Sequence, residues 1–354
     1  MNILFDIGHP AHVHFFKNPI KILQQKGHKI IVTSREKEFA LELLDEMGIK
    51  HVPLSKLGKG GLLSLAGELI KRDLSLLKVA RQNNISIMAA IGGVSIAHAT
   101  RLTGIPSLVF YDTENAKLQN LITYPFASQV IVPRCYQAWL PKKRHVRYAG
   151  YHELSYLHPA VFSPDKVTAL QNGLAETGDT FFIRVVSWQA SHDIGETGWS
   201  QELLENTVSK LTKLGRVLIS SESPLTGTLA DYAYQGKLSE VHHVLAFCKA
   251  FIGESATMAS ECAVLGVPAI YAAETGRGYT DEQEQKYGLV KNLRTIEWNS
   301  LESAIDSILD QPASNWIAAR QNLLRDTINV AEFISDTIES YPNPPAIMQR
   351  SLNN

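Results

Sequence analysis

The feature that most constrains the fold of this chain is a regular alternation of short apolar runs with helical patterns. Runs such as "NILFDIG", "KIIVTS" and "PSLVFYD" are separated by longer segments with apolar residues at helical spacing, such as "NPIKILQQKGH". Strands that alternate with helices are typical of parallel sheets with crossover helices. The sequence therefore predicts an α/β fold built from parallel strands.

The alternation is interrupted near residues 150–162, where "VRYAGYHELSYLHP" carries Tyr, His and Pro in place of an apolar period. A second alternating series follows, from "DTFFIRVVSW" to "VPAIYAA". We therefore expect two doubly wound halves, an N-terminal domain over residues 1–155 and a C-terminal domain over residues 156–340. The prolines and polar residues of "PNPPAIMQRSLNN" indicate a loosely held tail at residues 341–354.

Composition excludes several classes of partner. The 354 residues include 34 Lys and Arg and 35 Asp and Glu, so a net charge of −1 gives no reason to expect nucleic acid. Nowhere do eighteen apolar residues follow one another, which predicts no membrane span. Cys135, Cys248 and Cys262 show no zinc-ligand spacing and fit a reducing compartment. We expect a cytoplasmic protein without a structural metal.

Open parallel sheets bind ligands at the carboxyl ends of their strands, so the strand-to-helix turns are the candidate sites. In "FIGESATMASECAVLG", an apolar run leads to Gly253 and then to the small residues Ser255, Ala256 and Thr257. Small residues there let backbone amides at a helix N-terminus approach a diphosphate closely. Glu261 follows and is placed to accept hydrogen bonds from ribose hydroxyls. The alternative is a plain helix cap, with Glu261 a solvated surface acid.

The turn "DIGHPAHVHFF" brings His9, His12 and His14 together directly after the first apolar run. Their spacing matches no zinc pattern, and no carboxylate cluster accompanies them. Because imidazole titrates near neutral pH, we expect one of these residues, His12, to act as a general base or a substrate contact. The alternative is a hydrogen-bonded histidine of structural use, at His12 or at His14.

Two further strand ends carry charged residues. In "SLVFYDTENAKLQN", we expect Asp112 to cap the next helix, while Glu114 is a candidate base or hydroxyl contact. In "FFIRVVSW", Arg184 lies inside an otherwise apolar strand. Because an unpaired buried charge is costly, Arg184 requires a partner, and either a phosphate or an internal carboxylate would serve.

These windows resemble a known group of enzymes. "GHPAHVHFFKNPIKILQQKGHKIIVTS" is similar to the start of nucleotide-sugar glycosyltransferases of the GT-B fold, especially the lipid II N-acetylglucosaminyltransferase. "GESATMASECAVLGVPAIYAAETGRGYTDEQEQKYG" resembles the donor half of that superfamily and the non-hydrolysing UDP-N-acetylglucosamine 2-epimerases. The chain also resembles a group of uncharacterised bacterial and archaeal proteins placed near these enzymes. The resemblance covers nearly the whole chain and implies two Rossmann-like domains that face each other across a cleft.

On the N-terminal side, the resemblance implies roles for two residues. His12 stands where the transferase has a histidine in its first turn, which makes it a candidate base or acceptor contact. Glu114 resembles an acid of the epimerase site.

On the donor side, residues 255–257 match the loop that holds the donor diphosphate, directly after Gly253, and Glu261 matches the acid that holds the ribose. In "YTDEQEQ", Gln283 matches one of two adjacent glutamines that read donor-sugar hydroxyls. Glu284 stands where the second glutamine would be, which leaves the donor sugar open.

The implied reaction is a metal-independent transfer, in which the nucleotide sugar is a substrate and no cofactor takes part. In keeping with this, the sequence has no Asp-x-Asp pair of the kind that holds a divalent ion against a diphosphate. The amides of residues 255–257, the helix dipole and Arg184, which resembles the basic residue that meets the diphosphate, would stabilise the departing nucleotide diphosphate. His12 or Glu114 would receive the proton of the acceptor. The resemblance also places the chain in cell-surface polysaccharide biosynthesis, with a glycan, a lipid-linked sugar or a small molecule as acceptor.

Two segments suggest how a lipid-linked acceptor would be reached. Residues 55–72, "SKLGKGGLLSLAGELIKR", combine a glycine-rich loop with leucines and lysines, and residues 141–148, "PKKRHVRY", form a basic run. Together they are able to rest on the inner face of an anionic membrane. The alternative is a loop that leads into a core helix, next to a solvated basic patch.

Three classes of function follow from the sequence. A glycosyltransferase binds a donor and an acceptor, an epimerase or hydrolase turns over the donor alone, and a sensor binds the nucleotide sugar without chemistry. The epimerase is less favoured, because only Glu114 and Arg184 match its group of charged side chains.

Overall fold

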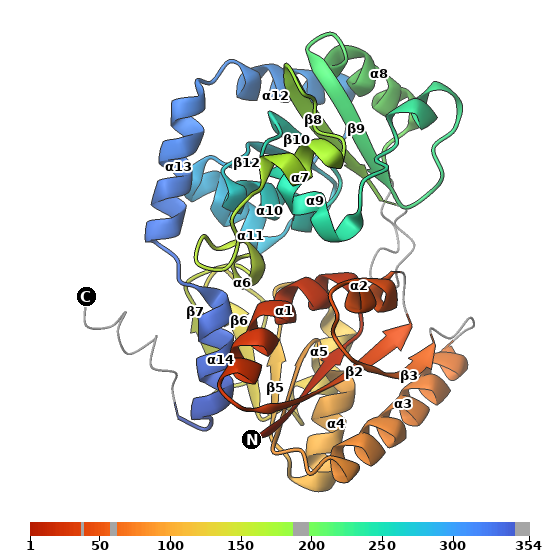
Figure 1. Cartoon of the computed structure of the whole chain (residues 1–354), viewed down its shortest axis with the longest axis vertical. Coiled ribbons are helices and arrows are strands. Elements are labelled where there is room, and N and C mark those ends of the chain that lie inside the picture. The colour runs from red at the N-terminus through yellow and green to blue at the C-terminus, as the bar shows by residue number, and fades with distance from the viewer. Residues whose placement is uncertain (37–38, 57–61, 187–197, 344–354) are drawn as a thin grey trace. The chain divides into compact units, whose positions relative to one another are not determined.

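The computed structural model describes residues 1–36, 39–56, 62–186 and 198–343 of the chain. Its contacts divide the chain into two compact units (Figure 1). Unit 1 comprises Met1–Val161 with Ile328–Asn354, and unit 2 comprises Phe162–Thr327.

Within the described part of unit 1, seven parallel strands form one sheet in the order β3-β2-β1-β4-β5-β6-β7. The chain moves outward from β1 to β3 and then returns to the other side of β1, so the order reverses between β1 and β4. Such a reversal opens a crevice at the carboxyl ends of the two strands. The strands are β1 (Asn2–Ile7), β2 (Lys29–Glu36), β3 (Val52–Lys56), β4 (Ile87–Ile91), β5 (Ser107–Phe110), β6 (Gln129–Pro133) and β7 (His145–Tyr148).

Helices cover both faces of this sheet, as Figure 1 shows for α1 and α2 on one side and α3 and α4 on the other. The helix α1 packs against α2, α6 and α14, whereas α4 packs against α3 and α5. The helices of unit 1 are α1 (Pro10–Gln25), α2 (Ala40–Glu46), α3 (Leu62–Gln82), α4 (Val94–Thr103), α5 (Lys117–Thr123), α6 (Leu154–Leu157) and α14 (Val330–Ser340).

Unit 2 repeats this architecture on a smaller scale. Its described strands form a five-stranded parallel sheet in the order β12-β11-β10-β8-β9, which reverses between β8 and β10. The strands are β8 (Asp179–Val185), β9 (Gly215–Ser221), β10 (Ala250–Gly253), β11 (Ala269–Ala272) and β12 (Val290–Leu293). The helices are α7 (Lys166–Gln171), α8 (Gln201–Leu211), η1 (Gly227–Tyr232), η2 (Leu238–Glu240), α9 (Val241–Leu245), α10 (Ala256–Leu265), α11 (Gly278–Glu282), η3 (Gln283–Tyr287), α12 (Trp298–Leu309) and α13 (Ala313–Arg325).

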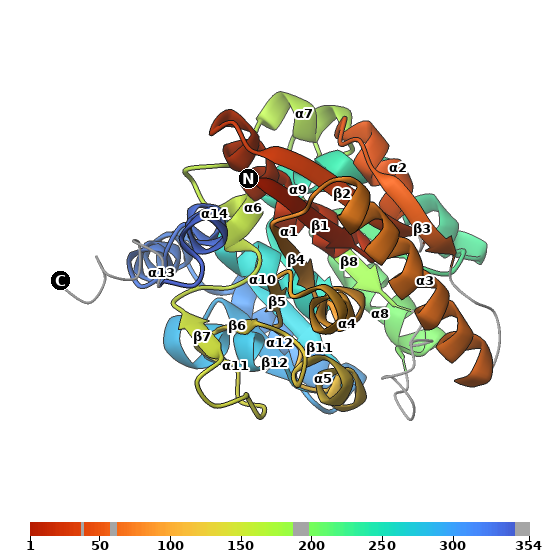
Figure 2. The same cartoon turned by 90° about the horizontal axis from the view of Figure 1, so that it is seen from below.

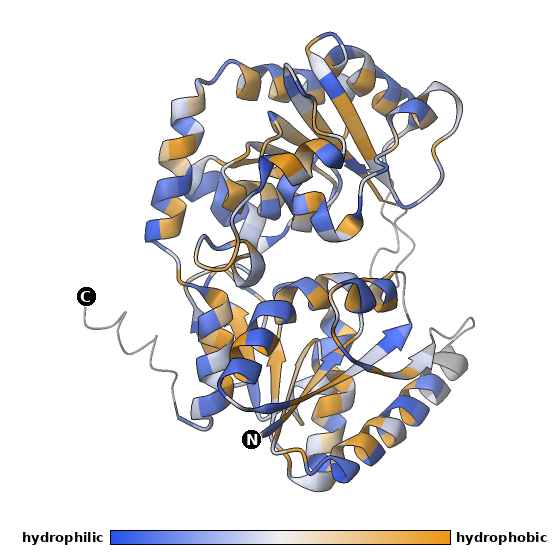
Figure 3. Cartoon of the chain, in the orientation of Figure 1, coloured by the Kyte–Doolittle hydropathy of each residue, from blue (hydrophilic) through white to orange (hydrophobic). Residues whose placement is uncertain are grey.

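The apolar runs of the sequence form the interior of each sheet, as the hydropathy colouring of Figure 3 shows. Helices on both faces bury these strands, so the runs are continuous and do not alternate with polar residues. In β10, every residue from Ala250 to Gly253 is buried. The predicted α/β class with two doubly wound halves is confirmed.

The last described helix, α14, belongs to unit 1, whereas the sequence placed residues 156–340 in one C-terminal domain. Its apolar stripe packs on α1 and α6, and the ring of Phe333 lies 5.0 Å from that of Tyr148. Helical periodicity shows that a stripe must be buried but not which core buries it. The boundary between the two units falls at Val161, where the sequence interrupts the alternation of strands and helices at residues 150–162. Of the predicted tail, residues 344–354 lie outside the described residues.

The carboxylate of Glu339 on α14 accepts hydrogen bonds from Lys26 and from His28, the latter at 2.8 Å. Burial raises the pKa of Glu339, but these hydrogen bonds outweigh it and hold the pKa below its usual value. A carboxyl whose pKa is lowered by folding stabilises the fold above its unfolded pKa, and this contribution is lost as pH falls through the folded value.

We expect Glu339→Gln to lower the melting temperature near pH 7, with a loss of up to about 1 kcal/mol, the usual range for an exposed ion pair. The difference from the parent protein should shrink as pH falls through the lowered pKa of this carboxyl, because the group loses its charge there. Melting curves between pH 3 and 7, with Glu46→Gln on the exposed surface of α2 as a control, measure this. An equal loss at every pH would show that the ion pair is not its cause.

Candidate functional site

The turn from β10 into α10 lies at the strand-order reversal of unit 2. Ser255 is the N-cap of α10, and its hydroxyl accepts a hydrogen bond from the amide of Met258 at 3.2 Å. The cap places Ala256 and Thr257 in the first turn of the helix, a segment without an acidic residue. The positive end of the helix dipole and the amides of this turn form a surface suited to an anion.

Gly253 ends β10 directly opposite Arg184 of β8. A Cβ at residue 253 would lie 2.2 Å from the carbonyl oxygen of Arg184, so only glycine allows the two strands to approach this closely. The structure thus gives Gly253 a packing role. Contact with a donor stays a prediction.

Glu254, which sequence reasoning did not select, is 2% exposed. Its carboxylate accepts hydrogen bonds from the backbone amides of Val186 at 2.9 Å and of Trp199 at 2.8 Å. It therefore fixes the chain that leaves β8 and the chain that enters α8. This contact explains why an acid follows the buried strand: it positions the backbone next to the α10 turn.

Glu261 lies on α10 and is 5% exposed, so its alternative interpretation as a solvated surface acid is wrong. Its Oε1 lies 2.9 Å from Nε2 of His242 on α9, a residue that is itself 2% exposed. The imidazole orients the carboxylate. A contact with ribose hydroxyls stays a prediction, and His242, from the motif "EVHHVL", is a residue that sequence reasoning missed.

The sequence left two alternatives for the partner of Arg184, a phosphate or an internal carboxylate. The structure shows an internal carboxylate as its partner. Its guanidinium donates to Ser220 Oγ and to Glu222 Oε1, both at 2.8 Å. These partners lie at and just after the end of β9, so Arg184 remains at the carboxyl edge of the sheet. A diphosphate would have to share the guanidinium with Glu222.

Gln283 and Glu284 lie in the π-helical turn η3, a conformation that is frequent at functional sites. Gln283 is fully buried and donates from Nε2 to Ser260 Oγ of α10 at 2.7 Å. Its Oε1 has no hydrogen-bond partner among the described residues. Glu284, by contrast, binds Asn292 with both oxygens, to the amide at 3.1 Å and to Nδ2 at 2.7 Å. The structure therefore ties Gln283 to the helix that carries Glu261.

Two cysteine thiols near α10 have no nucleophilic character. Cys248 and Cys262 are buried, and burial raises the pKa of both thiols well above the usual value. Thiols of this kind stay protonated and act as small core residues.

In unit 1, the three histidines of the first turn have different environments. His9 is the N-cap of α1 and accepts a hydrogen bond from the amide of Ala11. His14 is buried and its ring lies 5.4 Å from that of Tyr156. His12 accepts at Nδ1 from the amide of Gly8, at a long 3.3 Å. In this arrangement a neutral ring carries its proton on Nε2, so a base role requires the ring to leave the Gly8 contact.

His12 lines a cavity of about 310 Å³ at the carboxyl ends of β1 and β4, where the strand order of unit 1 reverses. Asp6 lies at the end of β1 and binds Arg72 of α3 at 2.6 Å, and both side chains are buried. Arg35 at the end of β2 donates to both oxygens of Glu68 at 2.8 Å. The remaining lining residues are Gly8, Leu69, Ile91, Gly93, Val94, Ser95 and Gln119.

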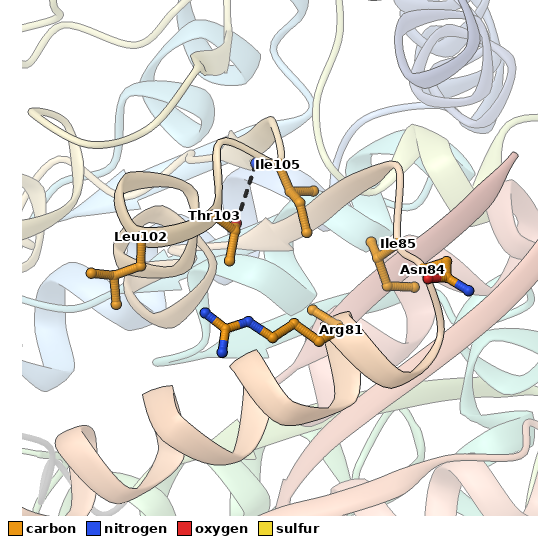
Figure 4. Close-up of a pocket in the computed structure, with 7 residues that line it drawn as sticks. Arg81, Asn84, Ile85, Leu102, Thr103 and Ile105 are labelled. Carbon is orange, nitrogen blue, oxygen red and sulfur yellow. Dashed lines mark hydrogen bonds between the residues drawn. The ribbon is translucent and has the colours of Figure 1, made fainter.

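A larger cavity, of about 420 Å³, lies at the other edge of the same sheet (Figure 4). Its lining includes Arg81, Leu102 and Thr103, whose hydroxyl accepts from the amide of Ile105 at 3.2 Å. These residues lie near the amino ends of β4 and β5. Because open α/β sheets bind ligands at the opposite edge, the smaller cavity is the better candidate in spite of its size.

The sequence predicted that Asp112 caps the next helix, and this prediction is wrong. The N-cap of α5 is Ala116, and Asp112 lies 3.1 Å from Nδ1 of the buried His152. Glu114, on the same loop after β5, is half-buried and does not line the cavity that contains His12. The structure thus brings His12 to the crevice of unit 1 but not Glu114, which stays a predicted contact.

The segments proposed for membrane contact are described only in part. Residues 57–61 lie outside the described residues. In the basic run 141–148, the guanidinium groups of Arg144 and Arg147 bind backbone carbonyls, whereas Lys142 and Lys143 are exposed. No described helix is both long and apolar enough to cross a bilayer, and the described residues contain no group of three His, Cys, Asp or Glu suited to a metal ion.

The family model described as "Protein of unknown function (DUF354)" matches residues 1–306. A curated relative, the uncharacterised protein MJ0665 of Methanocaldococcus jannaschii, is 24% identical over 136 residues, which span 38% of this chain and 39% of the relative.

Two solved structures show the fold. A UDP-GlcNAc 2-epimerase of Neisseria meningitidis is 14% identical with a TM-score of 0.66, and the match covers 100% of both chains. MurG of Acinetobacter baumannii is 16% identical with a TM-score of 0.61, over 96% of this chain and 99% of that one. These matches confirm the predicted GT-B fold.

Proposed function

Because the chain belongs to the DUF354 family and has the GT-B fold, we propose that it is a metal-independent glycosyltransferase that moves a sugar from a nucleotide-diphosphate sugar to a hydroxyl acceptor. The observation that carries this proposal is the β10–α10 turn of unit 2. There a helix N-terminus suited to an anion lies on the same helix as a buried, oriented carboxylate, Glu261, and is tied to the buried amide of Gln283.

The donor diphosphate would bind the amides of residues 255–257. Negative charge that develops on the departing diphosphate is stabilised by fixed amide dipoles without reorganisation. Arg184, at the carboxyl end of the adjacent strand β8, adds a positive charge that Glu222 holds in place. The Neisseria structure was solved with UDP-GlcNAc bound, which supports a nucleotide sugar as the ligand of this fold.

The donor sugar would be read by Gln283. A buried amide oxygen without a partner is costly, and a sugar hydroxyl or a water is the kind of group that would satisfy it. Both carboxylate oxygens of Glu284 accept hydrogen bonds from Asn292, so we assign Glu284 the role of holding η3 against β12. A contact of this carboxylate with the donor sugar would be a secondary role.

On the acceptor side, His12 would take the proton of the attacking hydroxyl. Its contact with Gly8 is long, and catalytic hydrogen bonds are often loose in an unliganded enzyme. Because His12 lines the cavity of unit 1, an acceptor hydroxyl bound there would meet the imidazole.

The second candidate is an epimerase or hydrolase of nucleotide sugars, which the epimerase-like fold supports. It would use the same donor residues but no acceptor. A third candidate is a sensor that binds without turnover. An assay of nucleotide release from radiolabelled nucleotide sugars, with EDTA and with or without candidate acceptors, separates the three. We expect nucleotide release that depends on an acceptor and persists in EDTA. Nucleotide release, or a change in sugar configuration, without an acceptor would overturn the proposal of a transferase.

A surface of unit 1 supports peripheral contact with a membrane. The helices α3, α4 and α5 are neighbours in unit 1 (Figure 2). Together with the loop after β6 they expose large apolar side chains. We call this surface the apolar face. It comprises Ile70, Leu74, Leu102, Leu118, Leu121 and Trp139, which are 62% to 68% exposed. Residues 70–149 carry eleven Lys and Arg but only three acids, Asp73, Asp112 and Glu114, so the face suits an anionic lipid surface.

We expect the protein to sediment with vesicles that contain phosphatidylglycerol and not with vesicles of phosphatidylcholine alone. The double substitution Leu118→Glu and Leu121→Glu should weaken this binding about tenfold or more, because it removes apolar contact and adds negative charge. Ile317→Glu on α13 of unit 2, an apolar residue 59% exposed, is the matched control. Equal binding by the parent and the double variant would exclude this surface.

A further inference from the structure

We propose that the cavity of unit 1 binds a neutral, hydroxyl-rich group, the accepting sugar ring or polyol, and excludes phosphate; this assignment of the acceptor class rests on the proposed transferase function. The cavity lies at the β1–β4 strand-order reversal and is defined above by its lining. The proposal follows from how the four charged residues of that lining are arranged.

The charges of the cavity balance each other. Arg72 is paired with Asp6 and Arg35 is paired with Glu68, so two cations meet two carboxylates. Both pairs are charge-assisted hydrogen bonds, and the second is bidentate, the strongest geometry available to an arginine. A phosphate entering this cavity would meet two carboxylates and would compete with them for guanidinium groups that are already engaged.

A network holds the pairs in place. Thr33 donates to Asp6 Oδ1 at 2.7 Å, and Ser55 donates to Glu68 Oε1 at 3.2 Å. Arg72 also donates to the carbonyl of Ser34 at 3.3 Å, and this connects the ends of β1 and β2 with α3. Rearranging the Asp6–Arg72 pair would leave a buried charge without its partner, which is strongly unfavourable. The cavity is therefore preorganised in its charge-balanced form.

A hydroxyl group fits such a lining. It donates one hydrogen bond and accepts two, so it is able to bridge a carboxylate and an adjacent guanidinium without disturbing their pairing. Gln119 and the buried Ser95 add neutral polar groups, and Leu69, Ile91 and Val94 provide apolar wall for the C–H faces of a ring. A volume of about 310 Å³ lies at the lower end for small-molecule pockets and suits a single ring.

The test uses methyl glycosides of glucose, galactose, mannose and N-acetylglucosamine, and myo-inositol, observed by saturation-transfer NMR on the full chain. We expect at least one to bind at millimolar concentration and to resist displacement by inorganic phosphate. The readout is displacement of the glycoside, because phosphate bound at the α10 turn of unit 2 would not compete with a glycoside bound in the cavity of unit 1.

The variant Glu68→Gln keeps the side-chain shape but leaves Arg35 uncompensated. In this variant phosphate should displace the bound glycoside at concentrations that leave the glycoside bound to the parent protein. Glu46→Gln on the exposed surface of α2 should behave as the parent does. Displacement of the glycoside by phosphate from the parent protein, or no binding by any member of the panel, would overturn the proposal.

A titration of the same samples with UDP separates this inference from the proposed function. Glycoside binding without any nucleotide binding would leave the cavity assignment standing and remove the transferase. Nucleotide binding without glycoside binding would remove only the cavity assignment.

Discussion

Replacement of His12 by alanine should lower the rate of sugar transfer by about 10²- to 10⁴-fold, the usual contribution of a general base, while nucleotide affinity stays nearly unchanged. The reason is positional: His12 lies in the cavity of unit 1, whereas the residues that we assign to the nucleotide lie in unit 2. Steady-state kinetics together with nucleotide calorimetry on the same preparations measure both quantities.

Two further variants test whether His12 acts as a base or only donates a hydrogen bond. His12→Gln retains an N–H donor, so substantial activity in that variant would show that a donated hydrogen bond is sufficient. His9→Asn is the matched control, because asparagine caps helices well and should preserve the start of α1. For a base, the acid limb of the pH dependence of kcat/KM disappears with His12. Nucleotide affinity that falls in step with activity would instead make His12 a donor contact.

Replacement of Glu261 by alanine should weaken nucleotide binding by about 1.5–3 kcal/mol, the range for a hydrogen bond to a charged group. Glu261 is buried on α10 and oriented by His242, so its carboxylate is held without loss of side-chain entropy when a ribose binds. Calorimetric titration with a nucleoside diphosphate measures the loss.

Alanine also leaves His242 without this partner, so a second variant is needed to separate binding from stability. Glu261→Gln keeps an oxygen for the imidazole and removes only the charge, and we expect it to retain the melting temperature while affinity falls. His242→Gln tests the orienting role and should weaken binding less than Glu261→Ala does. Unchanged affinity in both variants of Glu261 would remove this residue from the site.

The sequence predicted those parts of the fold that follow from local patterns. The strands and the order of elements could be recognised because each apolar run is buried within its own sheet, and the two motif windows indicated the GT-B fold. The position of α14 could not be predicted, because its apolar stripe is compatible with either core, and the choice depends on contacts with α1 and Tyr148 far away in sequence.

The candidate site was predictable to a similar extent. The α10 turn stood out because small residues, a cap and an acid follow one another in sequence. Pairs that form only in the fold were missed: His242 with Glu261, and Asp6 with Arg72, which are 66 residues apart. For the same reason the sequence predicts a helix cap at Asp112, whereas the partner of Asp112 in the structure is His152, which follows β7 in the chain. Sequence motifs identify which turns carry chemistry, but not which side chains are already paired.

The most direct test of the proposed function is a calorimetric titration of the purified protein with UDP, GDP, CDP and TDP in the presence of EDTA. We predict that at least one binds without metal, and that the same nucleotide binds at least tenfold more weakly to Glu261→Ala. Binding of none of the four, or equal binding by the parent and the variant, would contradict the assignment of the β10–α10 turn and Glu261 as the nucleotide site.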